Sequence, residues 1–300
     1  MYLLLGTADD PCCAAVLAGL QGRGCRARIV ENLLSHPVRL TWHLDTDRSF
    51  SQLAYEDEPP VADDDIEGVL VRYAGQINPA GWQPDDLAYM QAETKAALLG
   101  WLWSLPCPVL NRYPAAMWYR PRLPLLFWRQ LLSTCGLRAL DELVSNVEDE
   151  ARVFGHASAE TSMTGAVYRP LTGDTSYLVV NERDWTGLAA MQRRSPVYLT
   201  VPHATPQSVC VIGRRVVWNG VPPRQAAALE PAIFRFATAA GLGFVEVVLA
   251  KAAKRLCVVA VEHHPCFERF NESTKRAVVS GLIEFLITER DAGVGRATLP

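Results

Sequence analysis

The stretch from Leu256 to Phe270 joins an apolar run to groups that bind protons or metal ions. Leu256 to Val261 is continuously apolar and rich in β-branched residues, which predicts a strand buried on both faces. Pro265 ends this strand. Four ionisable or metal-binding side chains lie in or just beyond its end: Glu262, His263, His264 and Cys266. In α/β proteins, functional sites form at such strand ends, although a His pair that faces solvent would give the same pattern.

Two kinds of chemistry are open to these four side chains. They could bind a transition metal, with His203 approaching from another segment. Adjacent His side chains on an extended strand point to opposite faces, so a shared ion requires a turn, which Pro265 permits. A nucleophilic Cys266 activated by His264 is a weaker hypothesis, because spacing of two residues does not establish a hydrogen bond.

Length and composition are ordinary for a globular protein. The chain has 300 residues, which predicts two or three lobes. Its net charge of −3 provides no electrostatic footprint for nucleic acid, so we expect none as a partner. No apolar run is long enough to span a membrane. The first residues lack the basic start and the length of a signal peptide, so we expect a cytoplasmic location.

The eight cysteines form no CxxC pair, and most lie in apolar surroundings. This pattern predicts reduced, structural thiols. Cys12 and Cys13 stand at the start of a predicted helix, where the pKa of a thiol can fall. Packing beneath that helix is the interpretation we favour for this pair.

The first third of the chain predicts a parallel α/β domain. Tyr2 to Gly6 is a predicted strand, Ala14 to Leu20 a helix and Cys25 to Val30 a second strand, which is a β-α-β opening. Ile66 to Tyr73 (IEGVLVRY) is a further buried strand that ends in Arg72. An Arg at this place could face a ligand carboxylate or phosphate, or could pair with the nearby acidic loop. No GxGxxG follows the first strand, so we expect no dinucleotide site.

Two α+β units are predicted after a connector rich in Pro and Arg. Ala166 to Val180 predicts two strands joined by a turn that contains Gly, a hairpin that can lie over a ligand. Other predicted elements are strand 196–201, hairpin 208–218, helix 231–240, strands 244–249 and 256–261, and the amphipathic helix 273–289. We therefore divide the chain into an N-terminal domain (1–115), a central subdomain (116–195) and a C-terminal subdomain (196–300).

Several short segments, in their order along the chain, resemble the ATP-grasp superfamily. Its RimK-like ligases and the macrocyclases that make graspetides are the most similar members. PVLNRYPAAM (108–117) resembles the entry to the family's nucleotide-binding part, and AVYRPLTG (166–173) resembles the strand whose Lys holds phosphates. Residues 196–218 resemble the hinge strand and the strand pair after it, and VVAVEHHP (258–265) resembles the strand that supplies metal ligands. The resemblance implies an α/β (α+β) fold with a parallel N-terminal domain and two α+β subdomains.

The resemblance also implies site residues for an ATP-dependent, Mg²⁺-dependent carboxylate–amine ligase. Such an enzyme needs cations facing the phosphates and oxygen ligands around Mg²⁺. The residues it places beside the adenine and the phosphates of ATP are Arg169, Tyr198, Leu199 and Thr200. Glu262, with Glu246 from the preceding strand, would bind Mg²⁺. Arg72 would hold the carboxyl substrate.

The chain departs from the family pattern at the positions with the most demanding chemistry. It has no Lys between Lys95 and Lys251, so both phosphate-binding lysines of the family are absent. Arg169 keeps the charge of the second Lys but not its geometry, and Ala260 stands where the family has a Glu. We therefore expect a pseudoenzyme that no longer turns over ATP and that recognises a peptide or protein partner. ATP and Mg²⁺ are its candidate cofactors, and the substitutions leave open that it binds neither. The segment from Trp101 to Trp128 is rich in large apolar groups, which favours a homodimer interface or an inter-lobe core. The alternative function is a divergent but active ligase.

Overall fold

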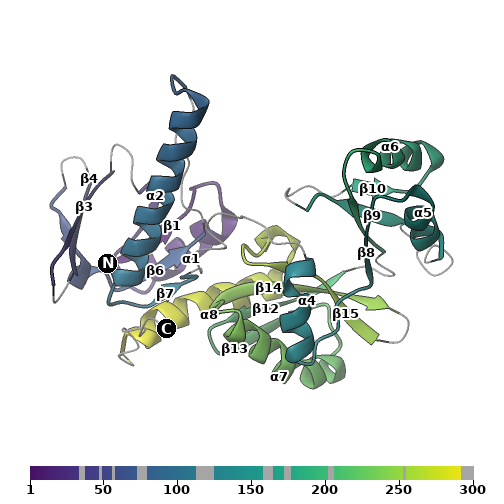
Figure 1. Cartoon of the computed structure of the whole chain (residues 1–300). Helices are drawn as coiled ribbons and strands as arrows, with labels where there is room; N and C mark the ends of the chain where they lie inside the picture. The colour runs from purple at the N-terminus through teal and green to yellow at the C-terminus, as the bar shows by residue number, and fades with distance from the viewer. Residues whose placement is uncertain are drawn as a thin grey trace.

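Three lobes follow one another along the chain (Figure 1). The structure is a computed structural model that describes residues 1–33, 38–46, 49–55, 58–72, 80–112, 125–157, 165–171, 177–201, 206–252 and 255–291. His203 and most of the connector that precedes residue 125 lie outside these residues.

The N-terminal domain is organised around a four-stranded parallel sheet in the order β2-β1-β6-β7. Its strands are β1 (Tyr2–Leu5), β2 (Ala27–Val30), β6 (Gly68–Val71) and β7 (Val109–Leu110). Helix α1 (Pro11–Gln21) connects β1 to β2 and begins at Asp10, whose carboxylate accepts the backbone N–H of Cys12 at 2.8 Å. The predicted parallel β-α-β opening is confirmed.

A three-stranded antiparallel sheet and a long helix complete this domain. The sheet contains β3 (Val38–Leu44), β4 (Ser49–Tyr55) and β5 (Val61–Ala62), and the helix is α2 (Pro84–Ser104). A short 3-10 turn, Asp63–Asp65, follows β5. Buried Trp101 of α2 donates its indole N–H to Ser51 Oγ at 2.9 Å, and Ser51 N–H donates to Asp63 at 2.7 Å. These bonds satisfy polar groups that would otherwise be costly to bury.

The central lobe is an antiparallel sheet in the order β10-β9-β11-β8 with two helices. Its elements are β8 (Glu142–Ser145), α5 (Glu148–Ala157), β9 (Ala166–Arg169), β10 (Tyr177–Val179), α6 (Glu182–Gln192) and β11 (Val197–Thr200). Because β11 pairs with both β8 and β9, sheet membership extends this unit through Thr200, past the boundary predicted at residue 195. A small core of its own includes Ala151, Trp185 and Leu199.

The C-terminal lobe contains a second antiparallel sheet, in the order β13-β12-β14-β15. Its elements are β12 (Gln207–Ile212), β13 (Arg215–Asn219), α7 (Pro223–Ala239), β14 (Phe244–Ala252), β15 (Arg255–Glu262), the 3-10 turn Phe267–Arg269 and α8 (Glu272–Asp291). Helix α7 begins at Pro223, eight residues before the predicted start at Pro231. A proline in the first turn is pre-organised for a helix, whereas Pro231 removes one internal N–H donor that the tertiary packing tolerates.

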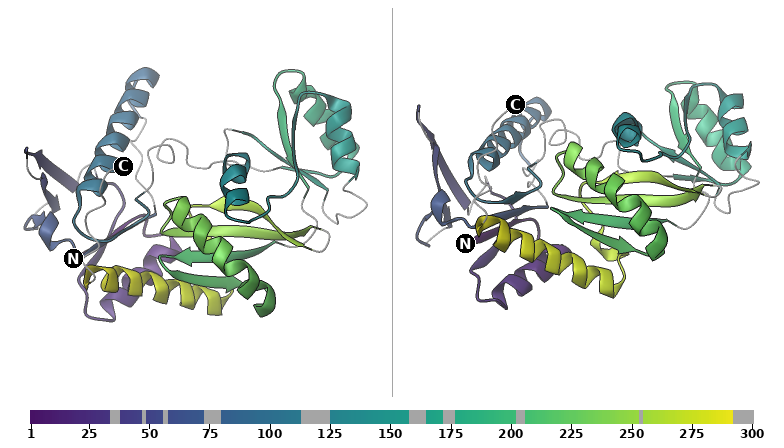
Figure 2. Two further views of the ribbon diagram at one scale, coloured as in Figure 1. Left: turned by 60° about the horizontal axis from the view of Figure 1, so that its bottom comes forward. Right: turned by 90° about the horizontal axis from the view of Figure 1, so that it is seen from below.

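The N-terminal and C-terminal lobes share their apolar cores, whereas the central lobe stands apart from them (Figure 2). Helix α4 (Leu125–Thr134) joins the C-terminal lobe, where Trp128 packs edge-on against Phe236 of α7. Asn111 follows β7 with a φ of 70° and accepts the backbone N–H of Phe244 at 2.8 Å. This buried amide therefore ties the parallel sheet to β14. Among the described helices, none is both long and apolar enough to cross a membrane.

Candidate functional site

The face of the central sheet that carries Arg169 also carries two of the predicted adenine neighbours. Tyr198 lies opposite Arg169 across the β11–β9 pair, and Thr200 lies opposite Val167. Because side chains alternate along a strand, Leu199 points to the other face, where it joins the core of the central lobe. The backbone of β11 is paired with β8 on one side and β9 on the other. Any nucleotide contact from this strand would therefore use a side chain.

Arg169 spans the space between the central and C-terminal lobes. One guanidinium nitrogen, Nη1, donates to the carbonyl oxygen of Val259 on β15 at 3.1 Å. Its Nε is buried and has no hydrogen-bond partner among the described residues. Val259 is the extra residue at the irregularity where the pairing of β15 with β14 shifts register. The cation that would face phosphates in a ligase thus donates to a backbone carbonyl.

A buried network that the sequence did not indicate lies beside Arg169. The carboxylate of Glu142 accepts the hydroxyl of Tyr198 and forms an ion pair with Arg129 of α4 at 3.0 Å, while its side chain is only 4% exposed. Arg129 Nη1 also donates to the carbonyl of Leu140 at 3.0 Å. Burial, reinforced by the hydrogen bond to Glu142, raises the pKa of Tyr198 above its ordinary value. The hydroxyl therefore stays protonated and donates.

The two predicted metal ligands are neighbours across β14 and β15. Glu246 lies directly opposite Glu262 in the antiparallel register, which brings their Cβ atoms to about 5 Å. Glu246 is 1% exposed, and one of its oxygens accepts the backbone N–H of Cys266 at 3.1 Å. Burial raises the pKa of Glu246, and the charge of Glu262 adds to this rise, opposed by bonds from Cys266 and Ser208. Burial therefore favours the neutral form of Glu246.

Mg²⁺ requires near-octahedral oxygen coordination, and Glu246 and Glu262 alone do not provide it. In the part of the chain that the structure describes, no group of three His, Cys, Asp or Glu side chains is placed to hold a metal ion. The same finding bears on the transition-metal hypothesis. The rings of His263 and His264 lie 4.3 Å apart, because β15 has already ended at Glu262, yet they gather no third ligand among the described residues.

Arg72 lies at the carboxyl end of β6, against the start of α1. Its Nε donates to Asp10 at 2.9 Å, and the two side chains are 9% and 18% exposed. Nη1 of Arg72 is buried and makes no hydrogen bond to the described residues. Burial raises the pKa of Cys12 to about 12, so this thiol at the helix start stays protonated, in keeping with a packing role.

No family model matches this sequence, and no curated protein matches it. Solved structures do match. The macrocyclase MdnC from Microcystis aeruginosa MRC, bound with precursor peptide MdnA, is 14% identical with a TM-score of 0.73, covering 96% of this chain and 99% of that one. The ATP-grasp ligase PsnB, complexed with a variant of its minimal precursor, Mg and ADP, is 16% identical with a TM-score of 0.68, covering 96% and 98%. A RimK-domain ATP-grasp protein from Sphaerobacter thermophilus DSM 20745 is 19% identical with a TM-score of 0.56, covering 96% and 99%.

These likenesses extend over nearly the whole chain. The protein has the ATP-grasp fold, and the predicted α/β fold class is confirmed. Identities below 20% establish the fold and leave the activity to be argued from the site.

Proposed function

We propose that this protein is an ATP-grasp pseudoenzyme that binds a peptide or protein partner and does not turn over ATP. The observation that carries the proposal is the bond from Arg169 to the carbonyl of Val259. A hydrogen bond from a charged donor contributes about 1.5–3 kcal/mol, so freeing Arg169 for phosphates would weaken nucleotide binding roughly 10- to 150-fold. The absence of lysine between Lys95 and Lys251 removes the two phosphate-binding lysines of the family pattern, which would otherwise compensate for that loss.

The network around Glu142 supports the same conclusion. Tyr198 would lie near the nucleotide in a ligase, yet its hydroxyl is held by Glu142, which also neutralises Arg129. Glu142 and its partners Tyr198 and Arg129 therefore already bond to one another on the face of the central sheet where ATP would bind.

One observation favours the alternative of a divergent, Mg²⁺-dependent ligase. Glu246 and Glu262 face each other across two strands, and two carboxylates placed in this way supply oxygen ligands that one cation can share. In the ligase hypothesis this cation is Mg²⁺, completed by the phosphates of ATP, with Arg72 on the carboxyl substrate. In the pseudoenzyme no cation is needed there, and burial raises the pKa of Glu246, which favours its neutral form.

The exposed edge of the central sheet is the surface that we assign to a peptide partner. Among the described strands, β10 pairs on one side only, and Tyr177, Leu178 and Val180 are 54%, 52% and 56% exposed. An edge strand with apolar side chains can accept an added strand through main-chain hydrogen bonds. The MdnC and PsnB structures contain precursor peptides, which is consistent with a peptide as the partner class.

A cytoplasmic location and a homodimer belong to the same proposal. At the start of α4, Leu126 and Phe127 are 42% and 53% exposed. They belong to the apolar segment for which the sequence allows either a homodimer interface or an inter-lobe core, and their exposure favours the interface.

ATP consumption tests the proposal. The purified protein is incubated with ATP and Mg²⁺, and ADP formation is followed by ³¹P NMR beside a Glu262→Gln variant as the matched background. We expect equal, negligible ADP from both proteins. ADP formed by the wild type and lost in Glu262→Gln would overturn the pseudoenzyme and favour the ligase alternative.

A further inference from the structure

Strand β3 forms one edge of the three-stranded sheet in the N-terminal domain, and this sheet lies on the side of the domain away from the other two lobes (Figure 1). Its residues pair with β4 from Val38 to Leu44 without a shift in register, and no described strand pairs with its other side. In an antiparallel strand, the N–H and C=O groups of alternate residues point to opposite sides. The outer edge of β3 therefore presents main-chain donors and acceptors along its whole length.

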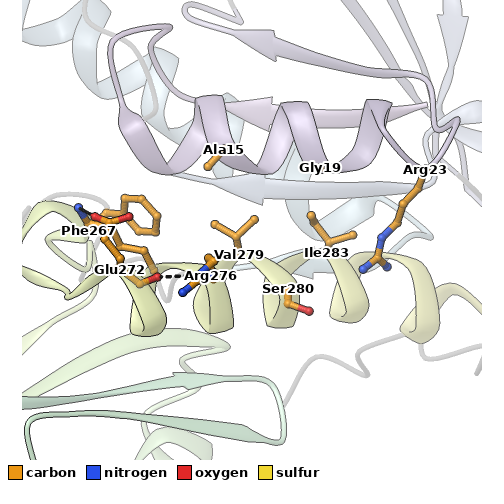
Figure 3. Close-up of a pocket in the computed structure, with 10 residues that line it drawn as sticks. Ala15, Gly19, Arg23, Phe267, Glu272, Arg276, Val279, Ser280 and Ile283 are labelled. Carbon is orange, nitrogen blue, oxygen red and sulfur yellow. Dashed lines mark hydrogen bonds and ion pairs between the residues drawn. The ribbon is translucent and has the colours of Figure 1, made fainter.

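The chain closes other extended surfaces with its own residues. Helices α1 and α8 cover one face of the parallel sheet, and Ile283 of α8, only 3% exposed, packs against Gly19 of α1 (Figure 3). Strand β15 is also a long edge strand, but Val258 exchanges backbone hydrogen bonds with Arg138 and Leu140 at 2.7 and 2.8 Å. Strand β3 is thus a long edge that the described strands leave uncovered.

The composition of β3 does not protect this edge. A long exposed edge is a template for pairing with another chain, and natural proteins blunt it with Lys, Pro, a bulge or a very short strand. Residues 38–44 (VRLTWHL) contain no Lys, Pro or Gly, and Arg39 is their only Arg, Asp or Glu. The edge is therefore suited to accept an added strand.

The sequence of β3 indicates which strand that is. Apolar and polar residues alternate strictly, and the pattern is symmetric about Thr41. The apolar set faces α2, where a Cβ on Gly100 would lie 2.9 Å from the ring of Trp42, and the polar set (Arg39, Thr41 and His43) is exposed. A second β3 placed antiparallel about Thr41 thus matches apolar with apolar and polar with polar on each face.

This arrangement gives each residue a suitable neighbour in the second copy. The opposed pairs are Thr41 with Thr41, Leu40 with Trp42, Val38 with Leu44, and Arg39 with His43. Leu44 is 62% exposed in the single chain, and it gains an apolar neighbour. Arg39 does not face a second Arg39, so the pairing avoids that repulsion. The whole strand is paired in this register, with roughly six to eight main-chain hydrogen bonds.

We propose that a second copy of this protein adds its β3 antiparallel to this one, which gives a two-fold symmetric dimer with a continuous sheet in the order β5-β4-β3-β3-β4-β5. The assembly closes, because the strand left at each end, β5, has only two residues. The inference rests on the homodimer of the proposed function. It assigns the contact between the copies to β3, away from Leu126 and Phe127 of α4 (Figure 1).

Sedimentation of the full chain in a dilution series tests the proposal through Thr41. This side chain is exposed and faces its own copy, so Thr41→Lys places two ammonium groups opposite each other and Thr41→Glu places two carboxylates there. We expect the wild type to sediment with about twice the 33.1 kDa mass of the chain. Each variant alone should raise the dissociation constant of the dimer about fivefold.

Mixing the two variants is the decisive step. Lys and Glu then face each other across the symmetry axis, so an equimolar mixture of Thr41→Lys and Thr41→Glu should recover the dimer. A variant that had merely failed to fold would not be rescued in this way. Gln52→Lys is the matched control, because Gln52 is exposed and lies opposite Thr41 on β4, one strand inside the edge. Gln52→Lys and Phe127→Ser should both dimerise as the wild type does.

Three results would overturn the proposal: a wild-type monomer, equal dissociation constants for Thr41→Lys and Gln52→Lys, or no recovery on mixing. A dimer that survives Thr41→Lys but is lost in Phe127→Ser would remove β3 and keep the homodimer, with its contact on α4. None of these measurements involves ATP, so failure of the β3 contact and failure of the pseudoenzyme proposal are distinguishable.

Discussion

Truncating Glu142 to Ala should loosen the central lobe, because this carboxylate is the partner of two groups. The change leaves the hydroxyl of Tyr198 without its acceptor, although Tyr198 is only 1% exposed. A buried polar group that loses its hydrogen bond costs about 1–3 kcal/mol. The Arg129 side chain is 46% exposed, so loss of that ion pair adds only about 0.2–1 kcal/mol. We expect a total destabilisation of about 1–4 kcal/mol.

Native-state hydrogen exchange, resolved by mass spectrometry, measures this cost within the lobe itself. The amides of β8 and β11 report the free energy of opening the central sheet. Glu148→Ala is the matched control, since Glu148 forms an exposed pair with Arg152 on α5 and its loss should change the opening free energy by less than about 0.5 kcal/mol.

A double-mutant cycle isolates the hydrogen bond. Tyr198→Phe removes the orphaned hydroxyl, so adding it to Glu142→Ala should recover part of the lost stability, with a coupling of about 0.5–3 kcal/mol. If Glu142→Ala is no more destabilising than Glu148→Ala, or if the cycle shows no coupling, the buried network does not hold the lobe as described.

Three further predictions concern the junctions of the fold. Asn111→Ala removes the acceptor of a buried N–H, and we expect a loss of about 1–3 kcal/mol in urea unfolding, whereas an effect below 0.5 kcal/mol would refute the junction role. Gly213 and Gly241 both have positive φ, but a Cβ at Gly213 would lie 2.4 Å from the ring of Phe285 while one at Gly241 meets nothing within 4 Å. Gly213→Ala should therefore lower the Tm more than Gly241→Ala. The Gly241→Ala variant measures only the backbone strain, about 1–2 kcal/mol, and an equal fall in Tm for both variants would contradict the contact with Phe285. The raised pKa of Glu246 contributes stability that is present below the unfolded-state pKa near 4.5 and is lost as pH rises through the folded value. The unfolding free energy of Glu246→Gln should rise relative to that of the wild type between pH 4 and pH 8. A constant difference between the two proteins across this range would exclude the raised pKa of Glu246.

The sequence was most informative where a residue type that can bind a metal lies within a strong strand pattern. Glu246 and Glu262 were each assigned to a strand from a run of β-branched neighbours, and the two strands are adjacent along the chain. Their direct opposition depends on the register between the two strands. A shift of one strand by one residue would have placed its glutamate on the opposite face of the sheet. The alternation along β11 likewise separates Leu199 from Tyr198 and Thr200, although the three were predicted as one group.

Other features have no local signal. Glu142 follows an unremarkable segment, and its partner Tyr198 lies 56 residues away, so only the pairing of β8 with β11 brings them together. The residues of β8 do not by themselves predict that β11 is the strand that pairs with it. The bond from Arg169 to Val259 joins two lobes across 90 residues, and it rests on an irregularity in β15 that an apolar run does not reveal. Long-range polar contacts of this kind decide whether a site is open to a ligand, and composition and periodicity do not encode them.

Calorimetric titration with ATP and Mg²⁺ tests the central claim most directly. If Arg169 is held by β15, the wild-type protein should give no heat of binding at millimolar ATP, and Arg169→Ala should behave in the same way. Binding that requires Mg²⁺ and disappears in Arg169→Ala would contradict the pseudoenzyme and place Arg169 on the phosphates.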